Sequence, residues 1–106
     1  MTDKKIVLTT TATREDAGKI ARALVERRLA ACVNVVAIES VYRWKDAVES
    51  AEEWLLVIKT TGSALDQVNG AIKELHIYEL PECVVLPIEN GSEEYLAWIG
   101  ESVHLE

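Results

Sequence analysis

One short stretch gathers most of the side chains that could do chemistry. In HIYELPECVVLPI (residues 76–88), His76, Glu79 and Glu82 place an imidazole and two carboxylates within seven residues. Such a set could serve general acid–base catalysis or hold a borderline divalent metal ion such as Cu(II). The plain alternative is a solvated connection between a helix and a strand. His76, which supplies the imidazole, is the candidate metal ligand and the one credible general base.

The other nucleophiles and bases of the chain do not complete a catalytic set. His104 lies close to the C-terminus, where ordered geometry is hard to hold. Cys32 and Cys83 sit in apolar strand contexts, which raise the pKa of a thiol and make it inert. The five glycines are isolated and form no phosphate-binding loop. We therefore expect a protein that is not an enzyme, although a catalyst built on His76 stays open as an alternative.

The composition of the chain argues against nucleic acids and membranes as binding partners. The net charge of −7 and the scattered basic residues disfavour nucleic acid. No apolar run approaches the roughly 20 residues of a membrane span, and the N-terminus lacks the pattern of a secretory signal. Two cysteines without CxxC spacing fit a reducing compartment. We expect a cytoplasmic protein that forms a single domain over residues 1–106 and needs no cofactor to fold.

The elements that must position residues 76–88 can be read from apolar spacing and turn residues. β-Branched runs predict strands at 5–11, 31–44 and 52–61, and the run at 83–88 predicts a buried strand whose Pro87 marks an edge. Residues 45–51 are small and polar, which predicts the turn of a long hairpin. Thr13, Ser63 and Ser92 each precede an amphipathic segment and predict the starts of three helices.

The order strand, helix, strand, strand, helix, strand, helix predicts an α+β fold. It is the ferredoxin-like βαββαβ plan with an added C-terminal helix, in which helices cover one face of an antiparallel sheet. The usual strand order, 4-1-3-2, places Cys32 and Cys83 at opposite edges of the sheet. Three strand spacings separate them by about 14 Å, so we expect neither a disulfide nor a shared metal within one chain.

The predicted hairpin is too long for the domain. About 12 residues at 3.3 Å each span roughly 40 Å, whereas a domain of this size has a radius of gyration near 13 Å. The hairpin must therefore bend or project, and its outer half carries large apolar side chains: Ile38, Val41, Tyr42, Trp44 and Trp54. A projecting edge of this kind invites aggregation unless another subunit covers it. The sequence thus favours an oligomer over a monomer with a strongly bent hairpin.

Several motifs in one order resemble the CutA divalent-cation tolerance family. They are LAACVNVV (29–36), SVYRWKD (40–46), LLVIKTT (55–61), HIYELPECVVLPI (76–88) and YLAWI (95–99), and together they span nearly the whole chain. The resemblance implies a cytoplasmic homotrimer with exchanged hairpins, similar in shape to the PII signalling proteins and associated with tolerance to copper. It also implies an inter-subunit ligand cleft drawing on Cys32, Tyr42, Trp44, Lys59, Tyr78, Glu79 and Pro81.

The chain departs from the family pattern at three positions. Ile77 stands where the family commonly has proline, which changes the turn before Tyr78. Thr9 and Leu75 stand where some members carry a thiol and a second histidine, so His76 is left without those copper ligands. Two hypotheses remain beside the enzyme: a trimeric module that binds a metal ion or a small ligand in its cleft, and a structural trimer that serves as a scaffold for a partner protein.

Overall fold

The protein folds as predicted in its order of elements. The computed structural model describes residues 2–105, so Met1 and Glu106 of the expected domain lie outside it. The elements are β1 (Lys4–Thr11), α1 (Arg14–Glu26), β2 (Cys32–Trp44), β3 (Ala47–Thr61), the 3₁₀ turn η1 (Gly62–Ala64), α2 (Leu65–Leu75), β4 (Val84–Pro87) and α3 (Glu93–Ser102). No helix among residues 2–105 combines the length and apolar character required to cross a membrane.

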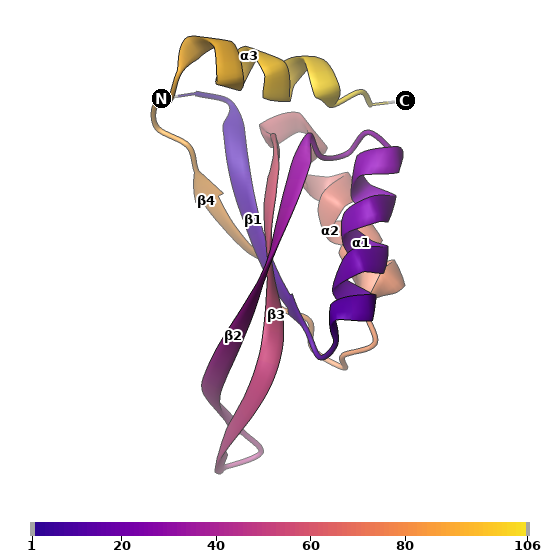
Figure 1. Ribbon diagram of the computed structural model, residues 1–106, viewed down its shortest axis with the longest axis vertical. Helices are drawn as coiled ribbons and strands as arrows, with labels where there is room; N and C mark the ends of the chain where they lie inside the picture. The colour runs from indigo at the N-terminus through magenta and orange to yellow at the C-terminus, as the bar shows by residue number, and fades with distance from the viewer. Residues whose placement is uncertain (1, 106) are drawn as a thin grey trace.

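The four strands form one antiparallel sheet in the order β2-β3-β1-β4. Helices α1 and α2 lie side by side on one face of this sheet, and α3 runs across its end (Figure 1). The arrangement confirms the α+β, ferredoxin-like prediction, including its strand order. It also places Cys32 and Cys83 at opposite edges, and both thiols are free.

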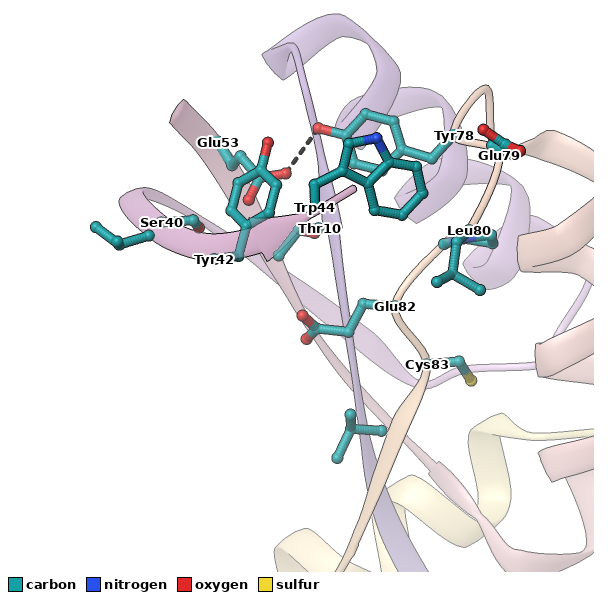
Figure 2. A pocket seen from close by; sticks show the side chains of 13 residues that line it. Thr10, Ser40, Tyr42, Trp44, Glu53, Tyr78, Glu79, Leu80, Glu82 and Cys83 are labelled. Atoms are coloured by element: carbon teal, nitrogen blue, oxygen red, sulfur yellow. Dashed lines mark hydrogen bonds between the residues drawn. The ribbon is translucent and has the colours of Figure 1, made fainter. Parts of the chain in front are cut away.

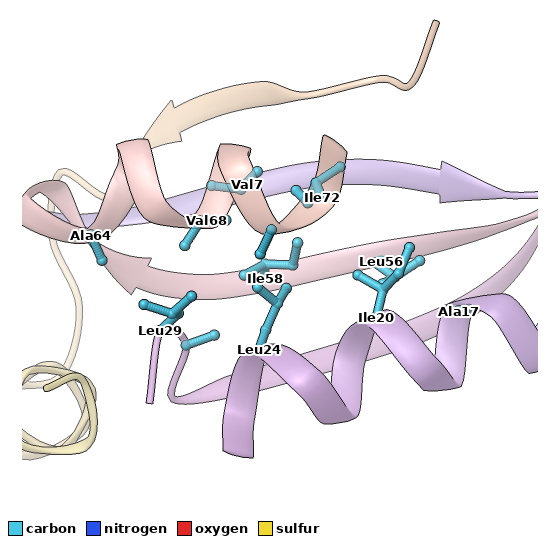
Figure 3. Packing of buried hydrophobic residues seen from close by; sticks show 12 residues of the cluster. Val7, Ala17, Ile20, Leu24, Leu29, Leu56, Ile58, Ala64, Val68 and Ile72 are labelled. Atoms are coloured by element: carbon cyan, nitrogen blue, oxygen red, sulfur yellow. The ribbon is translucent and has the colours of Figure 1, made fainter. Parts of the chain in front are cut away.

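The core lies between the sheet and the two helices. Ile20 and Leu24 of α1 and Val68 and Ile72 of α2 are fully buried against β1 and β3 (Figure 3). The four-residue spacing within each pair places both side chains on one face of its helix, which explains why one stripe faces inward. Val25, which the same periodicity assigned to the buried stripe of α1, is 41% exposed and lies at the outer margin of the helix.

Two of the three predicted helix caps are confirmed. The Thr13 hydroxyl accepts a hydrogen bond from the Asp16 amide at 3.1 Å, and that of Ser92 accepts one from the Tyr95 amide at 3.3 Å. The prediction for Ser63 was wrong, because η1 takes residues 62–64 and α2 begins at Leu65 without a side-chain cap. The Ser63 hydroxyl instead pairs with that of Thr61 at 3.1 Å.

The predicted turn at 45–51 was also wrong. Strand β3 begins at Ala47, and only Lys45 and Asp46 connect the strands. Both residues have left-handed backbones, with φ of 49° and 65°, as a two-residue type I′ hairpin turn requires. The ladder therefore continues to the pair Trp44 and Ala47, and the hairpin projects beyond the core, giving the molecule extents of 44 × 26 × 21 Å (Figure 1).

Strand β4 differs from the prediction in burial. It begins at Val84, one residue after Cys83, and its residues are exposed, with Val84 at 46% and Leu86 at 42%. The apolar run predicted a buried strand, but β4 is an edge strand that pairs only with β1. Its outer edge is left open by the other strands of the sheet. The expected edge position of Pro87 is confirmed.

The sheet is apolar on both faces. Side chains directly opposite one another across a ladder share a face, and neighbours along a strand alternate. Because Val7 and Ile58 face the helices, the register places the next residues on the opposite face. That helix-free face carries a half-buried to exposed apolar set: Ile6, Leu8, Val36, Leu55, Val57, Val84 and Leu86.

Candidate functional site

A cleft of about 820 Å³ lies between the outer half of the hairpin and the segment that follows α2 (Figure 2). The segment, residues 76–83, is the first part of the stretch 76–88 in which the sequence predicted the candidate chemistry. Strand β1 contributes Thr10, near its C-terminal end, and the hairpin strands β2 and β3 form the opposite wall of the cleft. The lining residues are Thr10, Ser40, Val41, Tyr42, Trp44, Glu53, Tyr78, Glu79, Leu80, Pro81, Glu82, Cys83 and Val84.

Tyr78 and Glu53 form the central polar contact of the cleft. The Tyr78 hydroxyl donates to Glu53 Oε2 at 2.7 Å, and Glu53 is only 8% exposed (Figure 2). Burial raises the pKa of Tyr78 well above its ordinary value, and the hydrogen bond and negative charge of Glu53 raise it further. The phenol therefore stays protonated and remains a donor at neutral pH.

His76 fastens the segment to the sheet. Its Nε2 lies 2.5 Å from the Thr10 carbonyl oxygen, and its Nδ1 accepts the Tyr78 amide hydrogen at 3.1 Å. Since Nδ1 accepts, the ring carries its proton on Nε2 and donates it to Thr10. The imidazole also lies against the Tyr78 ring, with centroids 4.6 Å apart. Both ring nitrogens thus form hydrogen bonds, so binding of a metal ion or proton transfer at His76 would require one of these hydrogen bonds to break.

Carboxylates supply the charge of the cleft. Glu79 and Glu82 are exposed on its loop wall, and Glu53 is buried on its strand wall. No lysine, arginine or histidine is among the lining residues. Within residues 2–105, no three side chains of His, Cys, Asp or Glu come together as a metal-binding group. The single chain therefore presents a strongly anionic cleft without a preformed metal centre.

Cys83 is the one thiol at the cleft. It is half-buried at the foot of β4, and burial raises its pKa, with the negative charge of Glu82 adding to the effect and the charge of Lys73 opposing it. A raised pKa keeps the sulfur as a neutral thiol at neutral pH, which makes it a poor nucleophile. The expectation of an inert thiol thus has a physical basis at Cys83.

The residues that the family resemblance assigned to a ligand site lie in two separate places in the chain's structure. Tyr42, Trp44, Tyr78, Glu79 and Pro81 line the cleft together. Cys32 and Lys59 do not line it.

Those two residues form a cross-strand pair at the inner end of the hairpin, where Lys59 Nζ contacts Asn34 Oδ1. Cys32 is twelve positions from Trp44 along β2, roughly 40 Å at the rise of an extended strand. One chain cannot bring both ends of its hairpin to one cleft.

Glu53, the most buried acid of the site, was not predicted from the sequence. The acid is paired opposite Ile38 and shares the helix-free face with Leu55. The two-residue period of β3 could have revealed it, because that period places Glu53 in line with the apolar residues 55 and 57. A carboxylate in such a row needs a partner, and Tyr78 is 25 residues further along the chain.

Comparison with known proteins identifies relatives over most of the chain. A family profile described as "CutA1 divalent ion tolerance protein" matches residues 5–102. The Divalent-cation tolerance protein CutA of Thermus thermophilus is 47% identical over 100 residues, which are 93% of this chain and 97% of that protein. The chloroplastic Protein CutA of Arabidopsis thaliana is 44% identical over 92% of this chain, which spans only 54% of that longer protein.

A solved structure is similarly close. The divalent cation tolerance protein Cut A1 of Thermus thermophilus superposes with a TM-score of 0.92 at 46% identity, covering 95% of this chain and 99% of the other. At 46% identity the likeness extends beyond the fold to the sequence as a whole.

Proposed function

Because the chain belongs to the CutA1 divalent ion tolerance family, we propose that it works as a homotrimeric binding module, PII-like in shape, whose inter-subunit cleft takes a divalent metal ion or a small ligand. One observation carries the proposal. Five of the expected site residues line the cleft, and Cys32 and Lys59 lie at the other end of the hairpin. A second subunit is the one means of uniting the two groups.

The exposed apolar surface supports an oligomer. On the projecting hairpin Val41 is 69% exposed and Val48 67%. The helix-free face of the sheet adds a second apolar surface that α1 and α2 leave open. Surfaces of this kind mark association sites in folded proteins. A closed ring of three chains, in which each hairpin lies on its neighbour, covers both surfaces with one repeated contact.

Metal binding at His76 belongs to the proposal as a weak site. A metal ion must displace Thr10 from Nε2 or the Tyr78 amide from Nδ1, and within residues 2–105 no third ligand is gathered. Calorimetric titration with Cu(II) should give micromolar or weaker binding, which His76→Ala largely removes. The matched control is His104→Ala, which should leave the titration unchanged. Tight binding that survives His76→Ala would contradict this assignment and direct the search to the two thiols.

A structural scaffold is the second candidate function. The engaged nitrogens of His76 and the absence of a three-ligand metal group within residues 2–105 favour it. Thermal unfolding with a panel of metal ions and metabolites separates the two functions, because a ligand at 100 times its Kd stabilises by about 2.7 kcal/mol. A trimer whose Tm no compound raises would leave the scaffold as the function.

We further propose that the protein is not an enzyme and acts in the cytoplasm. The family is named for tolerance to divalent ions and not for a reaction. Fractionation of the source cells tests the location.

A further inference from the structure

We infer that the cleft recognises an organic cation carrying an alkylated ammonium group. The inference rests on the proposed function in one respect, namely that this cleft is the ligand site. It goes further by naming the chemical class of the ligand. Three features of the described residues support it: the negative charge of the cleft lining, the aromatic side chains around that charge, and the lack of three converging metal-ligating side chains within residues 2–105.

The charge of the lining selects a cation. Three carboxylates line the cleft, and no lysine, arginine or histidine lines it. Glu53 matters most because it is 8% exposed, and of its two oxygens only Oε2 has a hydrogen-bond partner within residues 2–105. The other oxygen is not among the fully buried polar atoms without a partner, so it remains accessible and a bound cation can pair with it. Lys59 arriving from a neighbouring subunit would neutralise one carboxylate and leave two.

The aromatic residues favour an ammonium group over a hydrated ion. Tyr42, Trp44 and Tyr78 all line the cleft, and Figure 2 shows their rings gathered at the end that holds Glu53. The faces of aromatic rings attract alkylated ammonium groups, which carry a diffuse charge and lose little hydration. The Trp44 ring can hold a positive charge, since the primary ammonium of Lys45 lies 5.8 Å from its centroid.

The same lining is poor for a metal ion. Divalent ions need several converging ligands, and within residues 2–105 no group of three ligating side chains exists. In the single chain the cleft measures about 820 Å³, which is far larger than an ion requires. Leu80, Pro81 and Val84 add apolar wall that alkyl groups can contact.

The test compares a cation with its neutral isostere. Calorimetric titration of the intact wild-type assembly with choline should show binding, whereas 3,3-dimethyl-1-butanol, in which carbon replaces the ammonium nitrogen, should bind at least about tenfold more weakly. Equal binding of the two probes would overturn the inference, because shape and not charge would then decide. Failure of choline to bind would overturn it as well.

Two variants locate the site. Glu53→Gln removes a negative charge and keeps an acceptor for the Tyr78 hydroxyl. Glu79→Gln removes a negative charge at an exposed loop position that tolerates change. Each variant should weaken choline binding about tenfold or more. The matched control, Glu52→Gln, removes the same charge from an exposed neighbour on the opposite face of β3 and should change Kd less than about twofold. If Glu52→Gln weakens binding as much as Glu53→Gln, the attraction is diffuse and the inference fails. A trimer that binds metals or other metabolites but not choline refutes this inference alone and leaves the proposed function standing.

Discussion

Two buried threonines differ in one hydrogen bond. Thr9 and Thr60 are both fully buried on the helix-facing side of the sheet. The Thr60 hydroxyl donates to the Leu29 carbonyl oxygen at 2.6 Å, whereas the Thr9 hydroxyl has no partner within residues 2–105. A buried hydroxyl without a hydrogen bond costs free energy, so Thr9 weakens a core that its methyl group helps to fill.

We predict opposite effects of the same substitution at these positions. Thr9→Val should raise the free energy of unfolding by about 1 kcal/mol, because it removes the unsatisfied hydroxyl and keeps the shape. Thr60→Val should lower it by about 1 kcal/mol, because the Leu29 carbonyl loses its donor. Urea unfolding at one fixed protein concentration measures both. Equal losses of stability at the two positions would contradict the description of Thr9.

Tyr78 should make stability depend on alkaline pH. Its folded pKa is raised above the unfolded value of about 10 by burial and by Glu53. A raised pKa means that the folded state holds the proton more tightly, so this contribution is complete below pH 10 and is lost as pH rises toward the folded pKa. Tyr78→Phe should unfold with a shallower decrease of stability above pH 10 than the wild type. Tyr95→Phe, which changes an exposed ring on α3, should follow the wild-type curve.

At the scale of elements, the tightest constraint is the hairpin turn. Lys45 and Asp46 adopt left-handed φ angles without glycine at either position. Asp46→Gly should raise the free energy of unfolding by up to about 1 kcal/mol, since glycine meets no steric cost at φ of 65°. Asp46→Val should lower it, because a β-branched side chain is strained there. Thermal unfolding of the pair measures this, and a stabilising valine would show that the turn has another conformation.

The sequence predicted elements wherever one face is buried. The three- and four-residue spacing of the buried residues specified both helices that cover the sheet, because residues at that spacing share one face of a helix and pack into the core together. These residues are Ala17, Ile20 and Leu24 in α1 and Val68, Ala71 and Ile72 in α2. The start of β3 was missed because residues 47–50 are exposed on both faces, so no apolar alternation marks them as strand. The burial of β4 was overpredicted because the apolar run reflects a surface that one chain leaves open.

The site was predictable only in part for the same reason. The stretch 76–88 was identified from its polar cluster, and its residues 78–84 line the cleft. Glu53 was missed because its partner Tyr78 is distant in sequence. The grouping of Cys32 and Lys59 with the cleft came from family resemblance, and no single-chain geometry can produce it, since both lie at the far end of the hairpin.

At the scale of the whole molecule, the hairpin should hold the assembly together. Val41→Asp places a charge on the most exposed apolar part of the hairpin, where burial by a neighbour would leave it unpaired at a cost of several kcal/mol. We predict that it disperses the trimer or prevents folding. Val25→Asp makes the same change at an exposed position on α1, away from the hairpin, and should leave the assembly intact. A Val41→Asp protein that stays trimeric and equally stable would show that this part of the hairpin faces solvent.

The proposed inter-subunit cleft requires more than one chain, and light scattering coupled to size-exclusion chromatography measures the number of chains directly. For the wild-type protein at micromolar concentration we predict three times the chain mass of 11.8 kDa. A mass of one chain would leave Cys32 and Lys59 permanently apart from the cleft and would contradict the inter-subunit site. A mass of two chains would contradict the three-fold arrangement.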